Sequence, residues 1–287
     1  MELLKILVHI TFFYDQSEFI YLEKIIQSYN NFKCTVDIQV NTNSSFSNEI
    51  IDNYKNGKIT IKKLNLGLYK FLNNKNYFFT WISYKQLIKT KKKYDYYIYS
   101  EHDIELNYEN FEFYKEEKLR LDQKYNIGFI RTESKNNELY CVDVKDKKLK
   151  SLTLNDDQIY VKTNFLYSGL WILPASDFER FVDKKASNLK YLFIKNKRIS
   201  DKLQKFSKNK TLLFLVYCYK NKMGYGIREL PAHGPNYHFT NLFDEVLIPI
   251  NNNEISSKSF IKHLPNKYVK GNNSGISEIK FKELIID

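Results

Sequence analysis

Three ionisable residues, Glu101, His102 and Asp103, directly follow the apolar run YYIYS at residues 96–100. If the chain stays extended there, Glu101 and Asp103 point to the same side, because side chains alternate along a strand. Two carboxylates held close together repel each other unless a cation or a proton lies between them. Carboxylate oxygens are ligands that Mg²⁺ and Mn²⁺ prefer, and these ions commonly bind substrate phosphates as well. The triplet therefore favours a site for a metal–diphosphate, with a solvated strand end as the alternative.

The elements before this triplet must position it. Apolar runs and alternation predict four strands, and apolar residues at helical spacing predict two helices. The expected strands are 5–13, 34–43, 58–64 and 94–100, and the expected helices are 16–29 and 80–93, the second capped by Thr80. Strands joined by helices indicate crossover connections, so we expect an α/β fold with a mixed, mainly parallel central sheet flanked by helices. In open sheets of this kind ligands bind beyond the carboxyl ends of the strands, which is where the triplet lies.

The second half of the chain has weaker patterns. We expect strands at 126–133 and 164–174 and a helix at 199–222, whereas the tail from about residue 245 has few periodic features. No linker and no repeat interrupts the 287 residues. We therefore expect a single domain over residues 1–287, in which the less regular residues 111–287 wrap around a sheet formed by residues 1–110.

Composition limits the classes of protein. Hydrophobic residues make up 43% of the chain, which supports a sizeable core, and no apolar run reaches the roughly 20 residues that span a bilayer. The first residues lack a basic segment and a cleavage site, and three scattered cysteines without a CxxC pair suit a reducing compartment, so we expect a cytoplasmic location.

The formal net charge of +12 allows an anionic membrane surface or a phosphorylated substrate as partner. Lysine and asparagine dominate while arginine is scarce, as a drift to A- and T-rich codons would produce, so much of the excess is expected to be solvated surface. Clustered basic residues and known nucleic-acid-binding motifs are not evident, and we expect no nucleic-acid partner.

Several segments resemble GT-A glycosyltransferases, in the order in which that family has them. More narrowly, they resemble a subgroup with a Thr-Trp helix, a strand closing in Glu-Asp-Asp-Ile, and a closing His-Leu-Pro-Asn-x-Tyr. The matching segments are FFTWISYKQL, YDYYIYSEHDIEL, YSGLWILPASDFERF, YGIRELPAHG and IKHLPNKYV. With the first two strands included, the resemblance covers nearly the whole chain. It implies a GT-A-like, Rossmann-like sheet in which residues 1–110 bind a nucleotide-sugar and residues 111–287 bind an acceptor.

The resemblance also implies a metal site. Asp103 would bind Mn²⁺ or Mg²⁺ directly, Glu101 would face the ribose or metal-bound water, and the distant His263 would return to the metal or the diphosphate. The sequence departs from the subgroup at His102, where a carboxylate is usual, and one negative charge is lost. It departs again at Lys85, which follows a tyrosine where the subgroup commonly has His-Arg; a lysine meets a phosphate as a point charge without bidentate geometry.

Two carboxylates are candidates for the catalytic base that takes the proton of an attacking hydroxyl. Glu229 matches the family's acidic position beside the acceptor, and an ion pair with Arg228 or a surface lysine is the alternative. Asp177 is the rival, although a place in the first turn of a helix, where a carboxylate suits the helix dipole, explains it better.

Further residues are expected to bind the two substrates. His9, Thr11, Asn41 and Asn43 end the first two strands, where the family holds the nucleotide; a buried structural histidine and turn-forming asparagines are the alternatives. The acceptor is expected to meet Ser168, Gly169, Trp171 and Arg228, since glycine permits close approach and tryptophan can stack on a sugar, although Trp171 also suits the core.

The expected activity is therefore the metal-dependent transfer of a sugar from a UDP- or GDP-sugar to a carbohydrate or glycolipid hydroxyl, with the lysine excess allowing contact with a membrane face. One alternative is a nucleotidyltransferase of related fold, but HITFFYDQSE lacks the glycines of a phosphate loop. The other alternative is a non-catalytic basic protein that binds polyanions.

Overall fold

The computed structural model describes residues 3–46, 49–67, 75–90, 93–142, 144, 146–154, 158–162, 169–183, 234–236, 242–252, 254–269 and 279–287. The fold is mixed α/β, with parallel and antiparallel sheets. One of its sheets combines three parallel strand pairs with one antiparallel pair.

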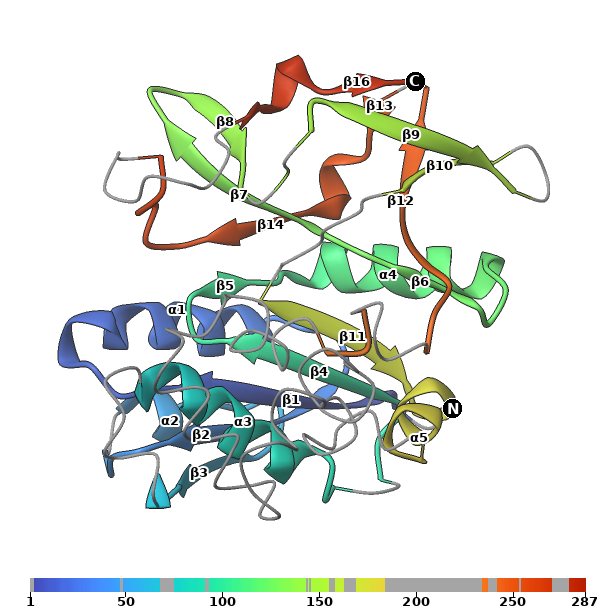
Figure 1. Ribbon diagram of the computed structural model, residues 1–287. Helices are drawn as coiled ribbons and strands as arrows, with labels where there is room; N and C mark the ends of the chain where they lie inside the picture. The colour runs from blue at the N-terminus through green and yellow to red at the C-terminus, as the bar shows by residue number, and fades with distance from the viewer. Residues whose placement is uncertain are drawn as a thin grey trace, which may run out of the picture.

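The central sheet has the strand order β11-β4-β1-β2-β3 (Figure 1). Its strands are β1 (Lys5–Phe12), β2 (Thr35–Thr42), β3 (Ile59–Lys63), β4 (Tyr96–Glu101) and β11 (Leu170–Pro174). The first four run parallel to their neighbours and β11 is antiparallel to β4. After β1 the chain adds β2 and β3 on one side and then crosses to place β4 on the other. The strand order therefore reverses between β1 and β4.

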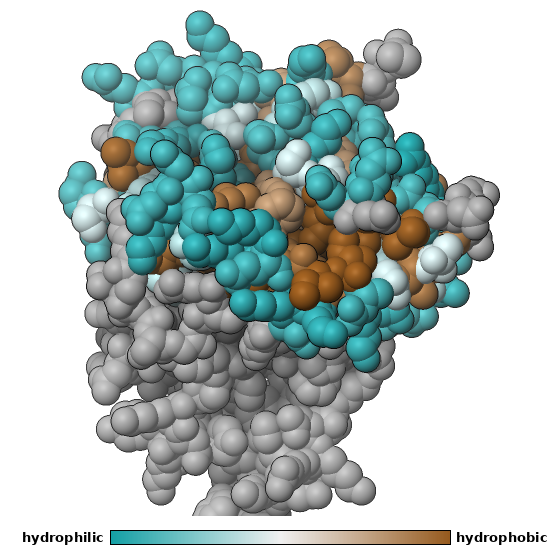
Figure 2. Space-filling model, turned by 90° about the horizontal axis from the view of Figure 1, so that it is seen from above, coloured by the Kyte–Doolittle hydropathy of each residue, from teal (hydrophilic) through white to brown (hydrophobic). Residues whose placement is uncertain are grey.

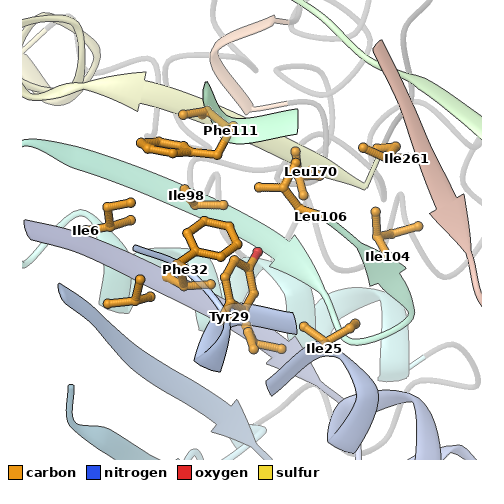
Figure 3. Close-up of a cluster of buried hydrophobic side chains, with 14 of the residues drawn as sticks. Ile6, Ile25, Tyr29, Phe32, Ile98, Ile104, Leu106, Phe111, Leu170 and Ile261 are labelled. Atoms are coloured by element: carbon orange, nitrogen blue, oxygen red, sulfur yellow. The ribbon is translucent and has the colours of Figure 1, made fainter. Parts of the chain in front are cut away.

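Alternation along the strands gives the central sheet two apolar faces. On one face, Ile98 of β4 packs with the buried residues of α1 (Phe19–Asn30) and α4 (Tyr108–Arg120), as Figure 3 shows for Tyr29 and Phe111, and with Phe32, which follows α1. On the other face, aromatic and aliphatic residues pack under α3 (Lys75–Leu87) and α5 (Ala175–Asp183); they include Leu7, Tyr84, Leu87, Tyr97, Tyr99, Trp171, Leu173, Phe178 and Phe181. Each large apolar side chain buried this way contributes about 1.5–3 kcal/mol, so these clusters fix the sheet that carries the triplet.

Two smaller sheets lie beyond α4, on the far side from α3 and α5 (Figure 1). One has the order β13-β12-β10-β9-β16, with β6 pairing β12, and the other has the order β15-β8-β7-β14-β5. Their strands are β5 (Ile104–Glu105), β6 (Tyr125–Ile127), β7 (Ile130–Lys135), β8 (Glu138–Cys141), β9 (Lys148–Thr153), β10 (Ile159–Lys162), β12 (Glu245–Asn251), β13 (Glu254–Ile255), β14 (Phe260–His263), β15 (Ile279–Lys280) and β16 (Ile285–Ile286). Short helical segments complete the described chain: α2 (Glu49–Asp52), η1 (Gln16–Glu18), η4 (Gly234–Asn236), η6 (Ser257–Ser259) and η7 (Phe281–Glu283).

The two halves of the chain interlock. Strand β11, from the second half, pairs with β4 in the central sheet, and β5, from the first half, pairs with β14 in a smaller sheet. Figure 2 views the molecule from the side of the smaller sheets and shows a largely hydrophilic face with apolar residues gathered in one area. None of the helices in the described ranges is both long and apolar enough to cross a bilayer.

Several expected elements differ from the observed ones. Helix α3 begins at Lys75, so Thr80 lies inside it and does not cap it, and the helix ends at Leu87 rather than at 93. The strand expected at 126–133 is observed as two strands, because β6 ends before Gly128 and β7 begins at Ile130. The tail from 245 forms five strands, β12 to β16, which its weak pattern did not predict. The helix expected at 199–222 lies outside the described residues.

Candidate functional site

The acidic triplet lies where the strand order reverses. Strand β4 ends at Glu101, next to the end of β1, with Thr11 and Glu101 in register. Beyond them the ring of Phe12 contacts that of His102, with centroids 4.9 Å apart. Parallel sheets leave a crevice at such a switch point, because the following chains depart to opposite sides. The fold thus positions the triplet where an α/β sheet commonly binds its ligand.

A turn separates Glu101 from Asp103. The chain does not stay extended after β4: His102 and Asp103 form a turn, and β5 begins at Ile104. The extended chain under which the two carboxylates would share one side of a strand is therefore not present. Glu101 instead lies against Gly169, whose backbone oxygen accepts a hydrogen bond from the Glu101 N–H at 2.8 Å.

The same turn brings His263 to Asp103 from 160 residues along the chain. Strand β5 pairs with β14, placing His263 opposite Ile104, and the Leu264 N–H donates to the Asp103 backbone oxygen at 2.9 Å. His263 Nε2 then lies 3.2 Å from Asp103 Oδ2, with both side chains buried. The pairing of β5 with β14 and the backbone hydrogen bond from Leu264 to Asp103 therefore assemble the centre of the site.

Glu133 fixes the orientation of His263. Its Oε1 is hydrogen-bonded to His263 Nδ1, and its Oε2 accepts the backbone N–H groups of Tyr268 at 3.0 Å and Val269 at 2.9 Å. Burial raises the pKa of Glu133, but these hydrogen bonds and the charge of His263 outweigh it and hold the pKa below its usual range. Tyr268 also stacks on the imidazole, with ring centroids 5.1 Å apart. A carboxylate that holds one ring nitrogen and leaves the other facing the site is a common support for metal-binding histidines.

Asp103 is a buried carboxylate with one oxygen unsatisfied. Burial raises its pKa, but the hydrogen bond with His263 and the charges of His102, His263 and Lys267 reverse the effect and hold the pKa well below its usual range. Oδ2 contacts His263 and lies 3.7 Å from Lys267 Nζ, whereas Oδ1 has no hydrogen-bond partner among the described residues. An ionised oxygen without a partner is costly to bury, so Oδ1 is suited to bind a cation.

His102 turns away from Asp103 towards the start of α1. Its Nε2 lies 2.9 Å from Glu18 Oε2. Burial lowers the pKa of His102, but the hydrogen bond with Glu18 and the charges of Asp103, Glu18 and Glu101 raise it overall. The pairing with His102 in turn lowers the pKa of Glu18. His102 therefore has an acidic partner of its own, Glu18.

The three side chains expected to bind a metal are not gathered as one ligand set. Within the ranges that the structure describes, no three His, Cys, Asp or Glu side chains are arranged to hold one metal ion. Asp103 and His263 are brought together, and Glu101 contacts Gly169, where a Cβ would come within 2.8 Å of Glu101 Oε2. Mg²⁺ and Mn²⁺ sites commonly use one or two protein ligands with water and substrate phosphates, which this pair can provide.

Three residues expected to bind the nucleotide are buried beneath α3. His9, Thr11 and Asn41 all contact the Ser83 hydroxyl, at 3.0, 2.6 and 3.1 Å respectively. Their exposed fractions are 5% or less. Desolvation lowers the pKa of His9 to about 3, and the charge of Lys62 adds to the effect. These side chains form a polar seam between α3 and the sheet and do not face solvent.

The other described candidates lie apart from Asp103. Asn43 accepts a hydrogen bond from the Tyr14 N–H at 2.7 Å, and Lys85 is exposed in the last turn of α3. Trp171 is 1% exposed and stacks on Tyr99 in the core, so its indole ring is not available to stack on a sugar.

Asp177 lies at the opposite end of the sheet. It follows β11, whose last residue, Pro174, is opposite Tyr96 at the start of β4. Its carboxylate is buried and pairs with Lys118 at 3.0 Å and Arg180 at 2.8 Å. The structure therefore does not bring Asp177 to the acidic triplet. Glu229, Arg228 and Ser168 lie outside the described residues.

Three residues of the site were not predicted from the sequence: Glu18, Glu133 and Lys267. Glu133 ends a strand that the sequence did predict, but no pattern shows that its carboxylate folds back to a histidine 130 residues away. Lys267 lies within the segment IKHLPNKYV, so a closer examination of that segment could have identified it.

No protein-family model matches the sequence, and no protein with a curated description does. Among solved structures, the chain is similar to two crystal structures of S. aureus TarS 1–349. The first has a TM-score of 0.34 at 11% identity, with 62% of this chain and 48% of that chain covered. The second, in complex with UDP-GlcNAc, has a TM-score of 0.34 at 12% identity, with 62% and 47% covered. The match spans about half the length of each TarS structure and assigns neither a family nor an activity to this chain.

Proposed function

We propose that this protein is a GT-A-like glycosyltransferase that moves a sugar from a UDP- or GDP-sugar to a hydroxyl of a carbohydrate or glycolipid. One observation carries the proposal: an ionised, partly unsatisfied Asp103 lies at the switch point of the sheet, beside His263 from the chain's closing segment. The sequence resemblance named these two residues as partners, and they lie 3.2 Å apart.

The donor set fits Mn²⁺ or Mg²⁺. Asp103 Oδ1 is buried without a partner among the described residues, and His263 presents Nε2 to the same place. The two ring nitrogens of His263 face the carboxylates of Glu133 and Asp103. A cation bound by Asp103 and by Nε2 of a neutral imidazole would place positive charge between these two electron-pair donors. Such an ion stabilises the negative charge of a departing nucleoside diphosphate.

The chain's own residues carry the remaining roles. Glu133 holds the imidazole in place, because its second oxygen is anchored by two backbone N–H groups. Gly169 leaves room for the Glu101 carboxylate, which is suited to accept a hydrogen bond from a ribose hydroxyl or bound water. Glu229 is the proposed base for the acceptor hydroxyl.

The test is a donor screen that scores release of nucleoside diphosphate from UDP- and GDP-sugars, with and without Mn²⁺. Asp103→Asn, nearly equal in volume, should lower release at least ~100-fold, because it removes the charge that binds the cation. Asp122→Asn, at a carboxylate 60% exposed beyond the far end of α4, is the matched control and should retain activity. Glu229→Gln should also lose about 100-fold or more. Full activity of Asp103→Asn rejects the metal assignment. If the wild type releases nucleoside diphosphate from none of the donors, the proposed function is rejected.

A further inference from the structure

Lys267 is the solvent-facing partner of Asp103. Its Nζ lies 3.7 Å from Asp103 Oδ2, and its side chain is 42% exposed, against 7% for Asp103. Burial lowers the pKa of Lys267, but the nearby negative charges, led by Asp103, raise it above its ordinary value. Asp103 therefore has a buried partner, His263, and an accessible one, Lys267.

The backbone on both sides of Lys267 is fixed. The Leu264 N–H donates a hydrogen bond to the Asp103 backbone oxygen. Asn266 has a φ of 50°, in the left-handed region that asparagine tolerates. Its side-chain oxygen accepts a hydrogen bond from the Ser134 N–H at 3.1 Å. The next two backbone N–H groups, of Tyr268 and Val269, are held by Glu133. The flexible four-carbon side chain of Lys267 is thus the part that can move without a change in the loop.

A divalent cation and this ammonium group compete for the same carboxylate. With both present, the cation and the ammonium group would lie against the same carboxylate, and they would repel each other in this poorly solvated place. The diphosphate of a bound nucleotide would offer the ammonium group a new anionic partner beside the cation.

We propose, on the basis of the proposed function, that Lys267 is an exchangeable counter-cation: it neutralises Asp103 in the empty site and transfers to the donor's diphosphate when a divalent cation binds Asp103. Lys267 is then both a competitor of the free metal ion and a ligand of the nucleotide. A purely structural lysine would not have these two opposite effects.

The proposal predicts changes of opposite sign in one variant. Lys267→Met keeps the aliphatic stem and removes the charge. It should bind Mn²⁺ alone about two- to tenfold more tightly than the wild type, because the competing charge is gone. It should bind UDP or GDP in saturating Mn²⁺ roughly tenfold more weakly, because one charge-assisted contact is lost.

Isothermal titration of Mn²⁺ alone, and then of UDP and GDP in saturating Mn²⁺, measures both constants in the intact protein. Lys267→Arg should restore nucleotide affinity. Lys262→Met is the matched control, because this lysine on β14 is 75% exposed and 3.8 Å from Glu105, and it should change neither constant.

Each outcome decides the matter. If wild type binds Mn²⁺ and a nucleotide but Lys267→Met leaves both constants unchanged, or weakens both, Lys267 is not an exchangeable counter-cation and the proposed function stands. If wild type binds neither Mn²⁺ nor a nucleotide, the proposed function fails and this inference fails with it.

Discussion

Gly169 shows how one residue shapes the site. Its φ of 64° lies in the left-handed region, where side chains with a Cβ are strained, and its missing Cβ makes room for the carboxylate of Glu101. The sequence predicted Gly169 as a place of close approach, but expected an acceptor there. The structure adds a partner that the sequence could not indicate, because the contact crosses between β11 and β4.

We expect Gly169→Ala to displace the Glu101 carboxylate. A Cβ there would lie 2.8 Å from Glu101 Oε2, so nucleotide binding in Mn²⁺ should weaken, and the left-handed conformation should cost about 1–2 kcal/mol of unfolding free energy. Gly67→Ala is the matched control, since Gly67 has a φ of 56° with nothing within 4 Å of its Cβ position. It should lose similar stability in urea unfolding and retain nucleotide affinity. Equal affinity in both variants would show that the position of Glu101 does not matter for the nucleotide.

The pairing of Asp103 with His263 could be predicted from the sequence only through the family resemblance. Sequence spacing alone places the two residues 160 apart and says nothing of the turn that joins them. The turn itself also defeated the simple strand geometry expected for Glu101 and Asp103. Such local reversals depend on tertiary pairing, here of β5 with β14, which no local pattern specifies.

Among the elements, α3 is attached to the sheet in an unusual way. Beside its apolar contacts it rests on the polar seam of His9, Thr11, Asn41 and Ser83. Buried polar groups of this kind are stable only while each keeps its partner and its protonation state. Protonation of His9 would place a charge inside this seam.

The seam predicts a decrease of stability in acid. The folded pKa of His9 is about 3, below its ordinary 6.5, so as the pH falls the unfolded chain takes up the proton first and is stabilised relative to the fold. The stability that the fold has with a neutral His9 is fully present above pH 6.5 and is lost as the pH falls from 6.5 towards 3. Its slope reaches about 1.4 kcal/mol per pH unit. Urea unfolding across this range should show that slope reduced in His9→Gln. Parallel curves for the wild type and the variant would contradict a neutral, buried His9.

The parallel strands of the central sheet were predicted better than the elements of the second half of the chain. The predicted ends of β1, β2 and β4 lie within two residues of the observed ends, because apolar patterns of six to eight residues are clear. Helix α4 was missed, although Asn107 and Asn110 form a capping box at its start, because its mean hydropathy is low and its apolar stripe is narrow. The strands of two to four residues in the smaller sheets are too short to show any period.

At the scale of the whole molecule, the end of the described chain ties the two smaller sheets together. Strand β15 pairs with β8 in one sheet, and β16 pairs with β9 in the other. Between them the ring of Phe281 packs edge-on against Phe260, with centroids 4.9 Å apart. Residues 279–287 thus connect the sheet that carries His263 with its neighbour.

We expect Ile279→Ala to destabilise the fold by about 2–4 kcal/mol, because Ile279 is 5% exposed in the core of the smaller sheets. Ile285→Ala is the matched control, since Ile285 is 50% exposed and should lose only about 0.5 kcal/mol. Urea unfolding monitored by circular dichroism measures both. Equal losses would mean that β15 does not anchor this region.

The link between β5 and β14 consists of two residue pairs, Lys262 with Glu105 and His263 with Ile104. They are supported by the Leu264–Asp103 backbone hydrogen bond and by Ile104 and Ile261, which belong to the apolar cluster on one face of the central sheet. Separating the imidazole from the carboxylate would therefore also open this cluster. We therefore expect the centre of the site to come apart only together with the core that joins the two layers.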